Sequence, residues 1–491
     1  MGQHQSSASP LAPKKVDSIV QNAFHEIEKY TMEKTVKFTC NEEAMGAIGI
    51  TPGTAEYAVF ERSATFFASY PKSLSERSDI VPNILKVIGF YDNRLVPLFD
   101  LSLEDYTRLV FLSLAVQTTD PEAGHPLRVD ASKYYIQFTD ISVFVALLCS
   151  IFEINPVEKT TIIVDDQAVE AARKMLAPFR APIISYDTFC AIAHRFPYLF
   201  HPLSKIWDQL LYEQRPAEPQ QSELDMLGTS THTFLPRNCI YMLYMAQGPS
   251  ITEAIKLYIA RTDGFSMRAF ESKVVNWKAP SFMLVKGTRM TKPDLDLDEN
   301  VPKVTDTSLR DSKQVIFAVY VDSPWKISNK HGFAKCKTKI FQVEPNFSIF
   351  SPKSTVSSDE PGIGYFSPDK GIGFGLVPPP TRKITFNRAA NVSLIIDRFI
   401  ETGVFRCISD GGTFNADRYI DARLPYEDRF KIKTIEVWGI GSKEVLEAQQ
   451  REWEWERREA QRRASVNVGE DRAILELAGI IGKYDPNAGN N

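Results

Sequence analysis

The sequence lacks a long apolar run, and this excludes a membrane-spanning helix. The longest apolar stretch, residues 141–152, covers twelve positions, whereas a helix that crosses a bilayer needs about 20. The stretch therefore predicts a buried helix. The N-terminus also has no apolar core of the kind that marks a secretory signal.

Cysteine and surplus positive charge are scarce as well. Six cysteines are scattered along 491 residues without a Cys-x-x-Cys pair, which favours a reducing compartment and predicts buried free thiols. Lysine and arginine number 57 against 61 acidic residues, a formal net charge of -4. This balance disfavours binding to nucleic acid through a basic face, so we expect no direct nucleic-acid contact. The cysteines are Cys40, Cys149, Cys190, Cys239, Cys336 and Cys407.

The glycine-rich stretch GIGYFSPDKGIGFG, residues 362–375, does not fit a phosphate-binding loop. A P-loop needs Gly-Lys followed by Ser or Thr, but here Lys370 precedes its glycine. A dinucleotide fingerprint needs a third glycine and a following helix, and three prolines follow instead. The turn-forming sequence between Ser367 and Gly371 predicts a β-hairpin.

Other catalytic and metal-binding patterns are missing too. Gly264, Ser266 and Arg268 do not complete a nucleophile elbow, which ends in glycine. His-Glu-x-x-His is absent, and the alternating acids of 294–298 lack the glycine and glutamate of a calcium loop. We therefore expect no catalytic, cofactor-binding or metal-binding residues and no enzyme, and we expect Gly264, Ser266 and Gly371 to serve in turns and caps.

The N-terminus carries a lipidation pattern. Gly2 follows Met1 and Ser6 stands at the sixth position, which predicts N-myristoylation of Gly2. Residues 1–16 are polar and predict a flexible tether. Because one myristoyl chain binds membranes only marginally, we expect weak membrane association strengthened by a protein partner at the membrane.

The rest of the chain divides into segments that differ in composition and hydrophobic periodicity. Residues 17–212 predict a helical domain, with helices at 102–116, 141–151 and 166–177 and another beginning at 183. The polar residues 213–230 predict a linker. Residues 231–441 combine short β-rich runs with helical patterns at 250–260 and 267–277, which together predict an α+β domain built on antiparallel sheets.

The tail, residues 442–491, predicts a highly charged helix with glutamate–arginine pairs four residues apart. Trp453 and Trp455 stand out on this solvated helix. They either pack back on the preceding domain or anchor a protein partner, because tryptophan is enriched at the centres of interfaces.

Several segments of the second half, taken in order, resemble a TLDc domain. This resemblance implies two antiparallel sheets packed as a sandwich with flanking helices, followed by a C-terminal helix. Ala318, Ala334 and Leu376 depart from the family pattern, where glycine is common. The segments are LYIARTDGFS at 257–266, WKAPSFMLVK at 277–286, AVYVDSPWK at 318–326, TKIFQ at 338–342, GIGFG at 371–375 and FKIKTIEVWG at 430–439.

The whole chain resembles a fungal branch of this family, the proteins named for restriction of telomere capping. That resemblance implies a degenerate EF-hand-like array, without its ligands, in the helical N-terminal domain. The family is associated with oxidation resistance and with binding the proton-pumping vacuolar ATPase. It therefore implies a non-enzymatic adaptor or regulator, cytoplasmic and peripheral at the vacuolar membrane, with an indirect effect on telomere capping.

Two further alternatives follow from the resemblance. Glu436 matches the family pattern. It is either functional, as a partner contact or an acid of a polar network, or structural, and we favour the structural role. The alternative function is an enzyme of oxidative-stress defence. Cys336 lies between Lys335 and Lys337, so it is the cysteine with the local charge that would activate a thiolate.

Overall fold

The computed structural model describes about half of the chain, and the fold is given for this part alone. Residues 1–52, which include the predicted tether and Gly2, lie outside it, so the EF-hand likeness of the N-terminal domain stays a prediction. The described residues are 53–59, 62–63, 103–117, 130–151, 163–202, 227, 232–252, 254–291, 312–328, 332–334, 337–353, 362–379, 391–408, 412–419, 426–441, 445, 447–449, 451–452, 454–455, 457–459 and 461–462.

One half of the described structure is a group of helices around a small antiparallel sheet, which we call the helical unit. None of the described helices is long and apolar enough to cross a bilayer. Three short strands pair in the order β1-β2-β3, and no pattern in the sequence predicted them. The elements are α5 (Leu103–Leu114), β1 (Val116–Gln117), β2 (Tyr134–Gln137), α6 (Phe138–Ile151), α7 (Asp166–Leu176), β3 (Ile183–Ile184), α8 (Tyr186–Arg195) and α10 (Arg237–Gln247), with 3₁₀ turns at Ala131–Lys133, Ala177–Phe179 and Pro249–Ile251.

Local sequence sets where these helices begin. The Asp165 carboxylate accepts a hydrogen bond from the Ala168 backbone N–H at 2.8 Å and so caps α7. Ser185 caps α8 in the same way. Helix α6 has nine buried residues among its fourteen, which confirms the buried helix predicted over 141–151.

One predicted helix begins later than expected, and another is replaced by a strand. No helix begins at 183, because Ile183 and Ile184 pair with β2 and the helix starts only after the Ser185 cap. The helix predicted at 250–260 is a 3₁₀ turn followed by strand β4 (Ile255–Ile259). Pairing of β4 with a long partner strand outweighs its local helical pattern, since sheet formation depends on neighbours that are distant in sequence.

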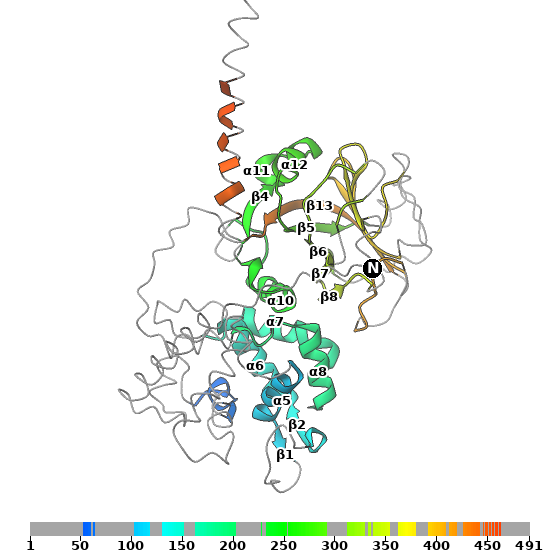
Figure 1. The fold of residues 1–491 in the computed structure, drawn as a ribbon. Helices are drawn as coiled ribbons and strands as arrows, with labels where there is room; N and C mark the ends of the chain where they lie inside the picture. Colours follow the sequence, from blue (N-terminus) through cyan, green and yellow to red (C-terminus); the bar gives the residue numbers. More distant parts are fainter. Residues whose placement is uncertain are drawn as a thin grey trace, which may run out of the picture.

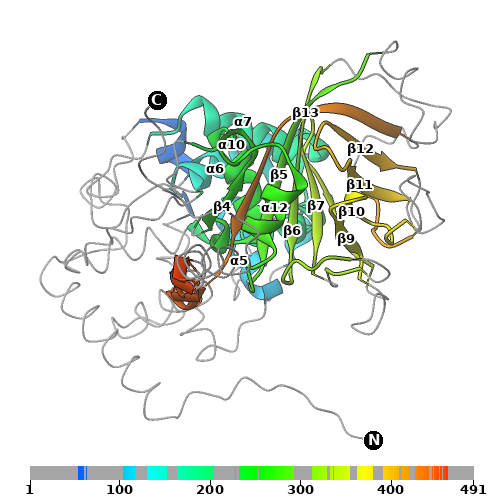
Figure 2. The ribbon, with the colours of Figure 1, turned by 90° about the horizontal axis from the view of Figure 1, so that it is seen from above.

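The other half is one antiparallel sheet of ten strands. Its path runs β8-β7-β6-β5-β13-β12-β11-β10-β9, and β4 pairs with β13 beside that path. Figure 2 shows β13 crossing the molecule, with β4 near one end and β12 near the other. The remaining strands are β5 (Ser281–Arg289), β6 (Gln314–Val321), β7 (Lys339–Glu344), β8 (Ser348–Phe350), β9 (Gly364–Ser367), β10 (Gly371–Phe374), β11 (Val392–Ile396), β12 (Thr402–Cys407) and β13 (Tyr426–Gly439).

The sheet curves so that its two ends face each other across a core. Phe317 of β6 stacks on Phe405 of β12 with ring centroids 4.8 Å apart, although β5 and β13 separate these strands in the sheet. A second hydrophobic core lies between the helical unit and the other face of the sheet, where Phe282 of β5, Phe341 of β7 and Trp438 of β13 pack against the helices. Figure 1 shows the helical unit on that side of the sheet.

The turn and cap predictions are confirmed. Ser266 begins α12 (Met267–Val274) by accepting a hydrogen bond from the Ala269 N–H at 3.1 Å. Gly264 ends the short helix α11 (Ala260–Asp263) with φ of 97°. Strands β9 and β10 form the predicted hairpin, and Gly371 has φ of 93° in its turn, a backbone conformation that favours glycine.

Candidate functional site at the junction of the helical unit and the sheet

A buried ion pair joins α8 to the sheet. Arg195 Nη1 donates to Asp417 Oδ1 at 2.5 Å, and both side chains are 4% exposed. Arg195 Nη2 also donates to the Phe347 carbonyl at 3.0 Å. The second carboxylate oxygen of Asp417 accepts from the Ile349 N–H at 2.8 Å. The guanidinium lies 5.1 Å from the centre of the Tyr419 ring, a cation–π contact.

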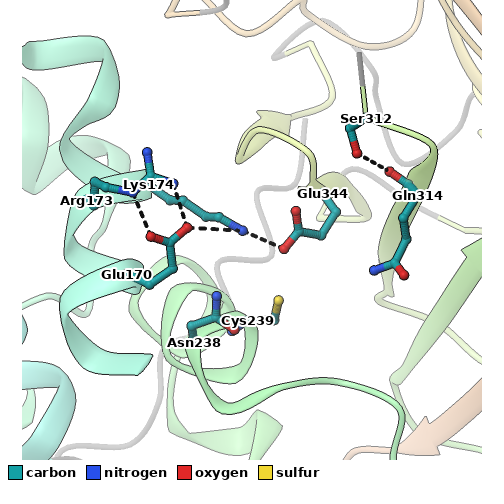
Figure 3. Close-up of polar contacts among 8 residues, drawn as sticks. All are labelled: Glu170, Arg173, Lys174, Asn238, Cys239, Ser312, Gln314 and Glu344. Carbon is teal, nitrogen blue, oxygen red and sulfur yellow. Dashed lines mark hydrogen bonds and ion pairs between the residues drawn. The ribbon is translucent and has the colours of Figure 1, made fainter. Parts of the chain in front are cut away.

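A second ion pair joins α7 to the end of β7. Lys174 Nζ lies 2.5 Å from Glu344 Oε1 and 3.8 Å from Glu170 Oε1, so it stands between two carboxylates (Figure 3). Arg173 binds Glu170 through two hydrogen bonds of 2.6 Å, which hold the pKa of Glu170 below its ordinary value. Together with Arg195, Lys174 fixes the helical unit to the end of β7, the turn before β8 and the segment between β12 and β13.

Glu436 lies at the junction too, and it is 2% exposed. Its carboxylate accepts hydrogen bonds from Thr233 Oγ1 at 2.8 Å, the Phe234 N–H at 3.0 Å and Trp438 Nε1 at 3.1 Å. Burial raises the pKa of Glu436 despite these donors. The structure therefore places Glu436 in a polar network that ties the segment before α10 to β13. A direct partner contact would require that segment to move.

The tail leaves the sheet beside this junction as a helix. Described residues between 445 and 462 are helical, and Figure 1 shows them standing away from the sheet. The base is held by Lys278, whose ammonium pairs with Glu452 and whose N–H donates to Gln449. Trp455 is 60% exposed, so it does not pack back on the domain, whereas Trp453 lies outside the described residues.

The described cysteines match the expectation of buried free thiols at three of four positions. Cys149, Cys239 and Cys407 are free and buried, and Cys190 is half-buried. Burial raises the pKa of Cys239 to about 12, so this thiol is protonated at neutral pH. Within the described part of the chain, no three His, Cys, Asp or Glu side chains gather in a way that could hold a metal ion. Cys336 and the acids of 294–298 lie outside the described residues.

Comparison with known proteins fits this architecture. The TLDc domain family matches residues 231–441, which include α10 and the whole ten-stranded sheet. A restriction of telomere capping protein 5 from Komagataella phaffii is 31% identical over 82% of this chain and 69% of its own length. The chain belongs to the TLDc family.

Other TLDc relatives of this chain carry the same name. The restriction of telomere capping protein 5 from Vanderwaltozyma polyspora is 39% identical over 48% of this chain, and the one from Saccharomyces cerevisiae is 31% identical over 61%. The chain spans 45% and 57% of the length of these two relatives. The names of these relatives describe restriction of telomere capping.

Sequence reasoning did not find the two ion pairs of the junction. Arg195 and Asp417 are 222 positions apart, and Lys174 and Glu344 are 170 apart. No local pattern marks such pairs, because each residue alone resembles an ordinary surface charge. Glu436 was found through the family resemblance, and its buried carboxylate accepts three hydrogen bonds.

Proposed function

We propose that this TLDc protein is a non-enzymatic regulator that binds a protein complex through its C-terminal helix. The observation that carries the proposal is Trp455, a large apolar side chain that is 60% exposed on a helix standing away from the sheet. An exposed tryptophan does not gain the favourable free energy of burying its apolar surface. A partner that covered the side chain would provide that gain.

The partner that we propose is the vacuolar proton-pumping ATPase, on the basis of the family resemblance. Membrane attachment through myristoylated Gly2 would hold the protein peripherally at the vacuolar membrane, close to that complex. An effect on telomere capping, which the names of the relatives describe, would then be indirect. The anchored base of the helix supports a stable presentation of Trp455, because Lys278 holds the first turns against the domain.

The test measures binding of the purified full chain to the soluble sector of the ATPase. Trp455→Ala should weaken binding by about 2 kcal/mol or more, the loss that defines an interface hot spot. Glu454→Ala, an exposed neighbour on the same helix, is the matched control and should leave binding unchanged. Deletion of residues 442–491 should abolish it.

Two results would contradict parts of this proposal. Equal binding by the full chain, the Trp455→Ala variant and the deletion would remove the helix from the interface. Absence of binding by every form would remove the ATPase as the partner. Mass spectrometry of the native N-terminus tests the membrane attachment separately, since an unmodified Gly2 rules it out.

A further inference from the structure

The turn between β11 and β12 exposes an aromatic ring on a strained backbone. Phe399 is 55% exposed at the tip of this turn, and the Arg398 guanidinium lies 4.4 Å from the centre of its ring. The next residue, Ile400, has φ of 59° and is 1% exposed. A β-branched residue in the left-handed region is an outlier, and such strain persists only where the surroundings impose it.

Hydrogen bonds hold this turn, residues 397–401, in one shape. The Asp397 carboxylate accepts from the backbone N–H groups of Glu401 at 2.8 Å and Thr402 at 2.9 Å. The Ile400 N–H donates to the Asp397 carbonyl at 3.1 Å, and the Ile432 N–H of β13 donates to the Glu401 carbonyl at 2.7 Å. These hydrogen bonds fix the conformation of the turn, so Phe399 stays exposed to solvent.

Basic residues lie on the elements next to this turn. The β9–β10 turn lies directly beside it, since a Cβ on Gly371 would stand 3.1 Å from the Arg398 backbone nitrogen. That turn carries Lys370, and β13 presents exposed Lys431 and Lys433 beside the point where it binds the Glu401 carbonyl. The turn and its neighbours thus carry four basic residues (Lys370, Arg398, Lys431 and Lys433) and two exposed acidic ones, Asp369 and Glu401. The Asp397 carboxylate instead accepts hydrogen bonds from the backbone of its own turn.

We propose that Phe399 and Arg398 form a membrane contact that inserts into the headgroup region of an anionic bilayer. A phenyl ring at a convex tip can enter the boundary of the acyl chains while cations beside it stay among the headgroups. A protein partner fits these observations less well. A stable interface buries about 800 Å² on each partner around a core of several apolar side chains, but the flanking Ile396 and Ile400 are already buried.

The contact supplies the second anchor that a single myristoyl chain requires. In that sense it rests on the proposed attachment through Gly2, although the two can be separated by experiment. The local surplus of basic side chains is small and the chain as a whole is acidic. The phenyl ring should therefore contribute more to the free energy of membrane binding than the basic side chains do.

The experiment is flotation of the full chain, produced with an N-myristoyltransferase, with vesicles of 70% phosphatidylcholine and 30% phosphatidylserine. Four forms are compared: wild type, Gly2→Ala, Phe399→Ala and the double variant. Phe399→Ala should lower the partition coefficient on the order of tenfold, both with and without the acyl chain. Ile183→Ala is the control, because Ile183 is also 55% exposed but belongs to the helical unit.

Further variants test the chemistry of the contact. Phe399→Trp should keep binding, which separates loss of the ring from loss of the fold. Arg398→Gln should lower binding to the anionic vesicles about fivefold and leave binding to pure phosphatidylcholine unchanged. If Phe399→Ala partitions like the wild type in both acylation states, the proposal is wrong. If Phe399→Ala instead weakens only binding to the ATPase sector, the tip is a protein contact and the membrane proposal is again wrong.

If Gly2→Ala partitions like the wild type while Phe399→Ala does not, the proposed acyl attachment fails and the tip contact stands. If the reverse holds, the tip contact fails and the acyl attachment stands. The vesicles hold no protein and the ATPase-sector assay holds no membrane, so neither result depends on the role of Trp455.

Discussion

Replacing Arg195 by alanine should destabilise the protein far more than replacing an arginine in an exposed ion pair. Arg195→Ala leaves Asp417 buried at 4% exposure without its cation, and it also deprives the Phe347 carbonyl of a donor. Removing one partner of a buried ion pair typically costs about 3 to 5 kcal/mol. The two backbone N–H donors that remain on Asp417 favour the lower half of that range.

The chain offers a matched control on the neighbouring helix. Arg173 also binds a carboxylate, at 2.6 Å, but its side chain is 55% exposed. Exposed pairs contribute about 0 to 1 kcal/mol, so Arg173→Ala should have a small effect. Both variants remove an arginine that pairs with a carboxylate, but only Arg195 is buried and also donates to a backbone carbonyl.

Urea unfolding followed by the fluorescence of the buried tryptophans Trp277, Trp325 and Trp438 measures the difference. Because Arg195 bridges two parts of the chain, Arg195→Ala should also separate one transition into two, with the helical unit unfolding first. The double variant Arg195→Met with Asp417→Asn should recover part of the loss. The reasoning is refuted if Arg195→Ala costs no more than Arg173→Ala, or if the double variant costs the sum of the single ones.

Two further predictions concern the sheet. Gly373→Ala should lower the free energy of unfolding by about 1 to 3 kcal/mol. The reason is that the new Cβ would lie 2.3 Å from the Tyr365 ring. If this is so, the effects of Gly373→Ala and Tyr365→Ala should be less than additive in the same urea assay, because the second substitution removes the ring. Burial raises the pKa of Glu436 above its ordinary 4.5, so the native state binds more protons than the unfolded state from that pH up to the raised pKa. Stability should therefore fall as pH rises through this window, and Glu436→Gln should flatten that slope in unfolding curves taken from pH 4 to 8; an unchanged slope would contradict the assignment.

The sequence predicted much of the local structure because its signals act over a few residues. The Ser266 cap, the hairpin of residues 362–375 and the buried helix near 141 depend on neighbours in the chain, and all three are present. The failures share the opposite cause. Ile183–Ile184 and β4 are strands because they pair with segments far away in sequence.

The candidate sites divide in the same way. Family resemblance pointed to Glu436, and the unusual tail tryptophans pointed to Trp455 without any knowledge of the fold. The exposure of Trp455 and the burial of Glu436 appear only in the structure. Phe399 has no sequence signal, because an aromatic residue after a short strand predicts burial as readily as exposure.

By itself, the sequence determined the family, the order of the two halves and the absence of the phosphate-loop and His-Glu-x-x-His patterns. Those features are encoded in residues that stand close together along the chain. The tertiary structure alone decided that one curved sheet encloses the core, that Arg195 meets Asp417, and that Ile400 is forced into the left-handed region. These depend on contacts between distant segments, which form only when burial of apolar surface brings the segments together.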